Sequence, residues 1–119
     1  IESTNYLKYL WSKYKIIQSY KSTKNLIEKY NLDAFIGLTR GPAWKINYKG
    51  GDYEAINNSL EFDSGGYAAH NGMPHITVPF FEINNFPVGI SIIGDRWTDM
   101  SVIRYASAIE KSRYNLKTQ

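Results

Sequence analysis

The stretch HNGMPHITVPF, residues 70–80, holds both histidines of the 119-residue chain. Histidine is a frequent metal ligand and the most common general base near neutral pH, so the pair is the first candidate for chemistry. His70 is expected in the last turn of a short helix, and His75 is expected to begin a strand after a glycine and a proline. The two rings would share no helical face, and a catalytic zinc ion would need a third ligand such as Asp52 or Asp63. A structural role for both histidines is therefore favoured over a metal site.

Ser64, His70 and Asp52 can be combined into a serine triad on paper, but any chain of this size offers such a set. The G-x-S-x-G sequence that places a nucleophilic serine at a strand-to-helix turn does not occur. The chain also has no cysteine, which excludes thiol nucleophiles, zinc–thiolate sites and disulfides. These residues therefore assign no catalytic group, no metal ligand and no cofactor site.

Composition indicates an ordinary folded protein. Hydrophobic residues make up 43% of the chain and charged residues 21%, values typical of one globular domain. No apolar run is long enough to span a membrane and no signal peptide is evident, so a cytoplasmic location is expected. Residues 1–30 carry six lysines against two glutamates, but lysines on the solvent side of a helix explain this excess, and no nucleic-acid-binding motif accompanies it. Neither nucleic acid nor a membrane is an expected partner.

A long amphipathic helix is predicted over residues 4–30. Its apolar residues recur mostly three or four apart, with lysines mainly on the opposite side. This apolar set consists of Leu7, Leu10, Tyr14, Ile17, Tyr20, Ile27 and Tyr30. Ser3 or Thr4 can cap its start, and Asn31 can adopt the left-handed conformation that ends it, with Leu32 folding back on the last turn. A break near residues 19–23 would split the helix in two; unbroken, it is longer than a small domain needs and is expected to pack on something larger.

A strand buried on both faces is predicted for residues 33–38, which include a continuous apolar run. A long irregular loop is expected over 39–63, where glycine, proline and asparagine are frequent. The segment TRGPAW at its start joins a charged residue, a turn and an indole at the carboxyl end of the strand, where α/β folds place ligands. Thr39, Arg40 and Trp44 are thus the candidates for a substrate pocket. The alternative is a structural turn whose tryptophan fills a gap.

The remaining predicted elements are a short helix over 64–71, a hairpin over 75–94 and a final helix over 99–114. Asp63 or Ser64 can cap the short helix, and Gly72 can end it. Asn84 and Asn85 form a two-residue connection able to adopt the left-handed angles of a tight hairpin turn. The order of helices and strands predicts an α/β fold in which a mixed sheet with a hairpin is flanked by helices. Residues 1–119 are expected to form a single segment.

Three motifs in order resemble the C-terminal part of amidase-signature enzymes. They are LDAFIGLTRGPAWKINYKGGD, AAHNGMPHITVPFFEINNFPVGISIIG and the closing helix. The family pattern there reads DA, an apolar run, PTNGPAW, then AAxAGxPxITVP and GLPVGxSFxG before a final helix. The matching residues are Gly41, Pro42, Trp44, Ala68, Ala69, Gly72, Pro74, Pro79, Pro87, Val88, Gly89 and Gly94. Departures occur at Leu38, where proline is usual, at Arg40, where asparagine is common, and at His70, Asn71, Met73 and His75, where family residues are small or vary.

The resemblance implies a large α/β hydrolase that cleaves linear amides with a lysine and two serines, the serines lying in a glycine- and serine-rich signature upstream of this region. Nothing in the chain matches that signature, so the resemblance implies no catalytic residue here. The chain is expected to be a structural and pocket segment, inactive alone, whose partners are the N-terminal catalytic portion and a small-molecule amide. The alternative is a non-catalytic binding module derived from the same fold. Unpaired strand edges would also leave the chain open to self-association as a homo-oligomer.

Overall fold

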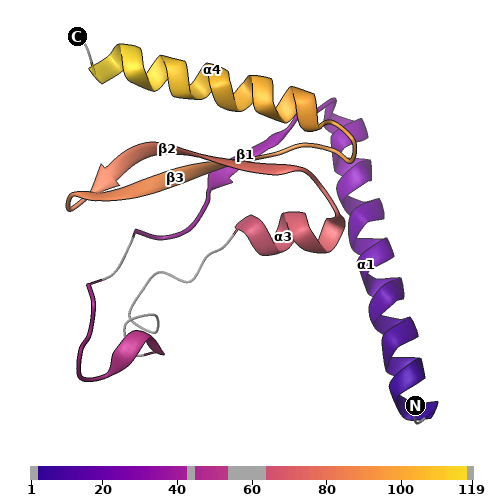
Figure 1. Ribbon diagram of the computed structural model, residues 1–119. Helices are drawn as coiled ribbons and strands as arrows, with labels where there is room; N and C mark the ends of the chain where they lie inside the picture. Colours follow the sequence, from indigo (N-terminus) through magenta and orange to yellow (C-terminus); the bar gives the residue numbers. More distant parts are fainter. Residues whose placement is uncertain (1–2, 43–44, 54–63, 118–119) are drawn as a thin grey trace.

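The computed structural model describes residues 3–42, 45–53 and 64–117, with side chains from residue 5 to residue 113 of those ranges. The helices and strands are α1 (Ser3–Tyr30), β1 (Phe35–Leu38), α3 (Ser64–Asn71), β2 (His75–Ile83), β3 (Phe86–Ile93) and α4 (Asp99–Lys117). Helices lie on both sides of a three-stranded sheet (Figure 1). The prediction of an α/β fold with a hairpin flanked by helices is confirmed, but the three described strands pair only antiparallel, so they do not form the predicted mixed sheet. Helix α1 runs unbroken through residues 19–23, and β1 begins two residues after its predicted start.

The hairpin of β2 and β3 forms most of the sheet. The strand order is β1-β3-β2, and β3 pairs antiparallel with both neighbours. Asn84 and Asn85 connect β2 to β3 with φ angles of 52° and 66°, the left-handed pair that a two-residue turn needs to match the sheet twist. The predicted turn is therefore confirmed. Between Pro79 and Phe81 the register shifts by one residue, which is a bulge beside a proline that has no amide proton for the ladder.

The two faces of the sheet pack against different helices. On one face, α4 covers a buried cluster of Val78, Ile92, Val102 and Ala106. On the other face, α3 and the second half of α1 meet the strands in a cluster of Ala68, Met73 and Ile93, with Tyr20, Ile27 and Phe35 packed around it. Successive side chains of a strand point to opposite faces. The adjacent β3 residues Ile92 and Ile93 therefore belong to the first and the second cluster, respectively. The result is a helix–sheet–helix arrangement (Figure 1).

Strand β1 is more exposed than predicted. Ile36 is 64% exposed and Leu38 is 39% exposed, although the continuous apolar run predicted burial on both faces. β1 lies at the edge of the sheet, and the buried strand residues under α4 come from β2 and β3. The prediction of burial on both faces is wrong for the described chain, because the burial of an edge strand depends on what packs beside it.

Helix α1 ends as predicted. Asn31 has a φ of 50°. Its amide donates to the Glu28 carbonyl at 3.4 Å, and the Leu32 amide donates to the Ile27 carbonyl at 2.9 Å, which are the paired bonds of a Schellman cap. In its second half, Thr23 is buried against α3, whereas every described side chain of residues 5–17 is exposed. The first half of α1 extends away from the sheet (Figure 1).

The turn after β3 ties α1 and α3 to the sheet through four residues, Asp95, Tyr20, Lys24 and Arg96, which we call the α1 clasp. The Asp95 carboxylate accepts hydrogen bonds from the Tyr20 hydroxyl at 2.8 Å and the Lys24 ammonium at 2.5 Å. Arg96 stacks over the Tyr20 ring at 3.6 Å and donates from Nε to the Asn71 carbonyl at 2.8 Å. Burial by itself raises the pKa of Asp95, but hydrogen bonds from Lys24, Tyr20 and the Arg96 amide outweigh it and hold that pKa below its usual range.

The chain has an open shape. Its Cα radius of gyration is 18.2 Å and its extents are 60 × 47 × 20 Å, whereas a compact domain of this length has a radius of gyration of about 14 Å. Large apolar side chains remain exposed on both α1 and β1. Among the described helices, none combines the length and apolar character needed to cross a bilayer.

Candidate functional site

Thr39 lies where β1, β3 and the start of α3 meet. Its amide donates to the Gly89 carbonyl at 2.9 Å, and its carbonyl accepts from the Ser64 amide at 3.1 Å. The Ser64 hydroxyl donates to the Leu38 carbonyl at 2.5 Å. Gly89 allows the close approach, because a Cβ at that position would come within 2.6 Å of Thr77 Cγ2 and 3.0 Å of Thr39 Oγ1. Thr39, the first pocket candidate, is therefore held at a fixed point of the fold.

Four polar side chains, His75, Ser91, Thr39 and Thr77, form a row across the three strands beside this point, which we call the polar row. His75 Nε2 lies 2.6 Å from Ser91 Oγ. The Ser91 hydroxyl donates to Thr39 Oγ1 at 2.9 Å, and the Thr39 hydroxyl donates to Thr77 Oγ1 at 3.3 Å. Ser91 is 1% exposed, so the centre of the row is closed to solvent. Sequence reasoning singled out neither Ser91 nor Thr77.

The burial of Ser91 and its hydrogen bond to Thr39 argue against a serine nucleophile in the polar row. A hydroxyl group has one proton, and the proton of Ser91 is donated to Thr39. In that arrangement Ser91 Oγ accepts from His75 Nε2 when the imidazole proton lies on that atom, whereas a general base accepts the proton of its serine. The buried Ser91 is also out of reach of a substrate. The row can orient the hydroxyl of Thr39, but it does not have the arrangement that starts acyl transfer.

The other residues considered for catalysis or metal binding make separate contacts. His70 Nδ1 donates to the Gly66 carbonyl one turn earlier in α3, at 2.6 Å. Ser64 uses its hydroxyl proton on β1, and Asp52 is an exposed residue in a helical turn at residues 51–53. Asp63 lies outside the described residues. Within the described ranges, no group of three histidine, cysteine or acidic residues could hold a metal ion.

The other two pocket candidates follow Thr39 along the chain. Arg40 is exposed and forms an isolated bridge just after β1. Trp44 lies outside the described residues. Thr39 and Arg40 are thus placed at the carboxyl end of β1, next to the start of α3, where α/β folds offer main-chain and side-chain groups to a ligand. The pocket role of Thr39, Arg40 and Trp44 stays a prediction.

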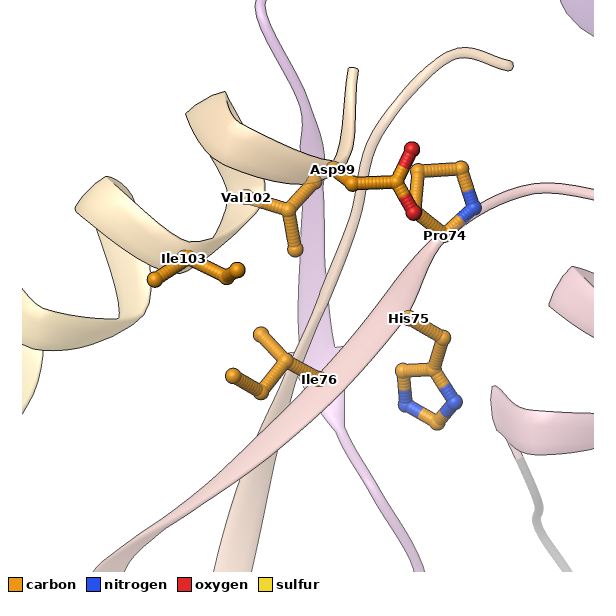
Figure 2. Close-up of a pocket in the computed structure, with 6 residues that line it drawn as sticks. All are labelled: Pro74, His75, Ile76, Asp99, Val102 and Ile103. Carbon is orange, nitrogen blue, oxygen red and sulfur yellow. The ribbon is translucent and has the colours of Figure 1, made fainter. Parts of the chain in front are cut away.

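A shallow depression lies between β2 and α4 on the other face of the sheet. It has a volume of about 200 Å³, and its lining residues are Pro74, His75, Ile76, Asp99, Val102 and Ile103. Figure 2 shows Val102 and Ile103 of α4 and Ile76 of β2 on one side, the Asp99 carboxylate toward Pro74, and the His75 imidazole pointing away from them. The His75 ring belongs to the polar row instead. The depression is an apolar gap with one carboxylate at its rim, which does not amount to a catalytic arrangement.

In sequence and in fold, the chain matches the C-terminal region of amidase-signature enzymes, as its motifs predict. It is 56% identical over 45 residues to the A subunit of glutamyl-tRNA(Gln) amidotransferase from Thermotoga maritima, which is 37% of this chain and 10% of the relative. The same protein of Pseudothermotoga lettingae is 47% identical over 47 residues, which is 39% of this chain and 10% of the relative. No protein-family model matches the chain.

Two solved structures share the arrangement of helices and strands. Peptide amidase from Stenotrophomonas maltophilia matches with a TM-score of 0.59 and 26% identity, covering 82% of this chain and 20% of that one. The crystal structure of PAM12A matches with a TM-score of 0.62 and 28% identity over the same shares. The aligned part of the chain thus spans a tenth of the length of the curated relatives and a fifth of the solved structures.

Proposed function

We propose that the chain is the C-terminal structural and substrate-pocket segment of an amidase that hydrolyses the carbon–nitrogen bond of linear amides. The observation that carries this proposal is the fold match of 82% of the chain to a fifth of peptide amidase, at 26% identity. The 56% identity to an amidotransferase over 45 residues adds to it. The open shape and the exposed apolar edge strand support a place within a larger fold.

In this proposal, the groups that break the amide bond lie outside the 119 residues. Amide hydrolysis needs a nucleophile, a base to take its proton, and donors that stabilise the oxyanion. The polar row is poorly suited to the first two tasks, because Ser91 is buried and donates its proton to Thr39. Two serines and a lysine of an upstream catalytic portion would do the chemistry, while this segment supplies packing and one pocket wall. The chain alone is then inactive.

Thr39, Arg40 and Trp44 form that wall. Backbone hydrogen bonds to Gly89 and Ser64 fix the position of Thr39. A hydroxyl that is already oriented loses little entropy when it binds a polar group. The guanidinium of Arg40 offers planar donors to a carbonyl or carboxylate of the substrate. The indole of Trp44 offers apolar area. The expected substrate is therefore a small amide with a polar group near its scissile bond.

Reconstitution tests the proposed function. The 119-residue chain and the upstream portion of the same polypeptide are purified separately and assayed, alone and mixed, for release of ammonia or amine from a set of linear amides. We expect turnover only in the mixture. Turnover by the 119 residues alone would contradict the proposal. A mixture that associates but hydrolyses none of the amides would favour the alternative, a non-catalytic binding module with the same fold.

The pocket wall is tested in the same mixture. Arg40→Ala is expected to raise KM by about tenfold, because it removes a donor that binds the substrate, and to leave kcat nearly unchanged. Lys45→Ala is the matched control, since Lys45 is also an exposed cation on the same loop. Equal KM values for the two variants would place Arg40 outside the pocket.

A further inference from the structure

The first half of α1 carries an apolar patch that the rest of the described chain leaves uncovered. Leu7, Leu10, Trp11 and Tyr14, which we call the α1 stripe, line one shallow hollow on the helix surface. Their side chains are 67%, 41%, 60% and 51% exposed. Four large apolar side chains gathered in this way are characteristic of a surface that associates with another one.

The α1 stripe faces away from the residues that hold α1 to its own fold, so the apolar residues predicted to share one side of this helix are divided between two sides. In the second half of the helix, Tyr20 and Ile27 pack on α3 and the sheet, and the Thr23 hydroxyl lies 2.5 Å from the Tyr67 hydroxyl of α3. At about 100° of rotation per residue, the centre of the stripe lies roughly 150° around the helix from these contacts. The first half of α1 also runs out beyond the sheet (Figure 1). A partner of the α1 stripe must therefore approach from the opposite side of the helix.

The charges around the α1 stripe select the kind of partner. Lys8 and Lys15 flank the stripe on one side and Lys13 on the other, and residues 5–27 contain no acidic side chain. Lys15 Nζ lies 5.6 Å from the centre of the Trp11 ring, so positive charge sits directly beside the apolar patch. A second copy of the chain would bring lysines against lysines, which disfavours pairing. An apolar surface rimmed by carboxylates is complementary to the stripe.

The fold match places the chain within a larger fold, which can offer such a surface. The chain covers a fifth of the solved structures that it matches, so most of the amidase fold that surrounds the corresponding segment lies outside these residues. The α1 clasp fixes the second half of α1 against the turn after β3, and this aims the α1 stripe outward. We propose that the α1 stripe docks on an apolar, carboxylate-rimmed surface of the upstream catalytic portion. This inference rests on the proposed function and names the residues through which the two portions bind.

Two substitutions on opposite sides of α1 test the docking surface. Trp11 and Tyr9 are 60% and 58% exposed, and they lie about 160° apart around the helix. Binding of each variant to the purified upstream portion is measured by isothermal titration calorimetry, with circular dichroism to check that the helix content is unchanged. We expect Trp11→Asp to weaken binding by at least about tenfold, and Tyr9→Asp by less than about threefold. Lys15→Glu should weaken binding and reduce its dependence on salt.

Several results would overturn the docking proposal. Equal affinities of the Trp11→Asp and Tyr9→Asp variants would do so, as would a failure of the two portions to associate. Self-association of the 119-residue chain that is lost in Trp11→Asp would assign the stripe to a second copy. Trp11-dependent binding to phosphatidylglycerol vesicles would assign it to a lipid surface. The proposed function and the docking surface fail under different results. If Trp11→Asp selectively loses binding but no amide is hydrolysed, the docking surface stands and the proposed function is contradicted. If the mixture hydrolyses an amide but the two variants bind equally well, only the docking surface is contradicted.

Discussion

Gly94→Ala is expected to lower the free energy of unfolding by about 3 kcal/mol, at the upper end of the range for overpacking a core. Gly94 is buried between β3 and α4, and a Cβ at this position would overlap Val102 Cγ2 and Thr98 Oγ1 and lie 3.6 Å from Pro74 Cγ. These neighbours cannot move cheaply. Val102 is 1% exposed and has a stiff β-branched side chain, and the Thr98 hydroxyl donates to the Asp95 carbonyl at 2.7 Å.

Chemical denaturation measures this loss against a matched glycine. At Gly37 in β1 a Cβ would meet no atom within 4 Å, so Gly37→Ala should change stability by less than about 0.5 kcal/mol. Val102→Ala removes the methyl group that the new Cβ overlaps. The double variant with Gly94→Ala should therefore cost at least about 1 kcal/mol less than the sum of the single variants. Strictly additive costs would show that Val102 is not the obstacle.

Features fixed by a few neighbouring residues could be predicted from the sequence. Asn84 and Asn85 adopt the left-handed angles of the hairpin turn, and Asn31 ends α1 with the same kind of backbone. Gly72 has a φ of 61° and ends α3. The amides of Gly72 and Met73 donate hydrogen bonds to carbonyls of the preceding turn. In each case the residue type permits a positive φ that most side chains disfavour. The sequence alone therefore carries the information.

The polar row could not be predicted, because it depends on one extra residue in β2. The register set by the hairpin turn, continued without a bulge, would place Val78 opposite Ser91 and Thr77 opposite Ile92. The bulge after Pro79 places Ser91 opposite Thr77 instead, and so beside His75. A one-residue slip moves a side chain to the other face of a sheet. A proline inside a strand is a signal for a bulge, although it does not tell on which side of the proline the extra residue lies.

For the pocket candidates and β1, the sequence predicts position along the chain but not burial. The segment after β1 predicted that Thr39 lies at the end of a strand, and the structure adds its bonds to Gly89 and Ser64. The apolar run of β1 could not reveal that Ile36 is exposed here, because an apolar edge strand looks the same in sequence whether or not another element covers it. Residue types report what a side chain prefers, whereas burial also depends on atoms outside the segment.

Asp95→Asn is expected to cost about 2 kcal/mol at pH 7, in the range for hydrogen bonds to a charged group. The substitution keeps the shape of the side chain but removes its charge. The Lys24 ammonium lies 2.5 Å from the Asp95 carboxylate, and the Asp95 side chain is only 17% exposed. Glu28→Gln is the matched control, because Glu28 lies 3.8 Å from the same ammonium with a side chain that is 64% exposed. An exposed ion pair at this spacing contributes about 0.5 kcal/mol or less. Equal losses in the two variants would contradict the structural role of the α1 clasp.

The pH dependence of stability separates the charge of Asp95 from its packing. Its pKa is held below its usual range in the folded chain, so its contribution is complete above the unfolded value of about 3.9 and is lost as the pH falls through the folded value. The hydrogen bond to Asp95 raises the pKa of Lys24, so that contribution is complete below about pH 10.4 and is lost as the pH rises through the folded value. Urea titrations should therefore show a difference between the native chain and Asp95→Asn that is constant between about pH 5 and pH 9 and shrinks on both sides. A difference that does not shrink as the pH falls would mean that the charge of Asp95 is not what holds α1 to the sheet.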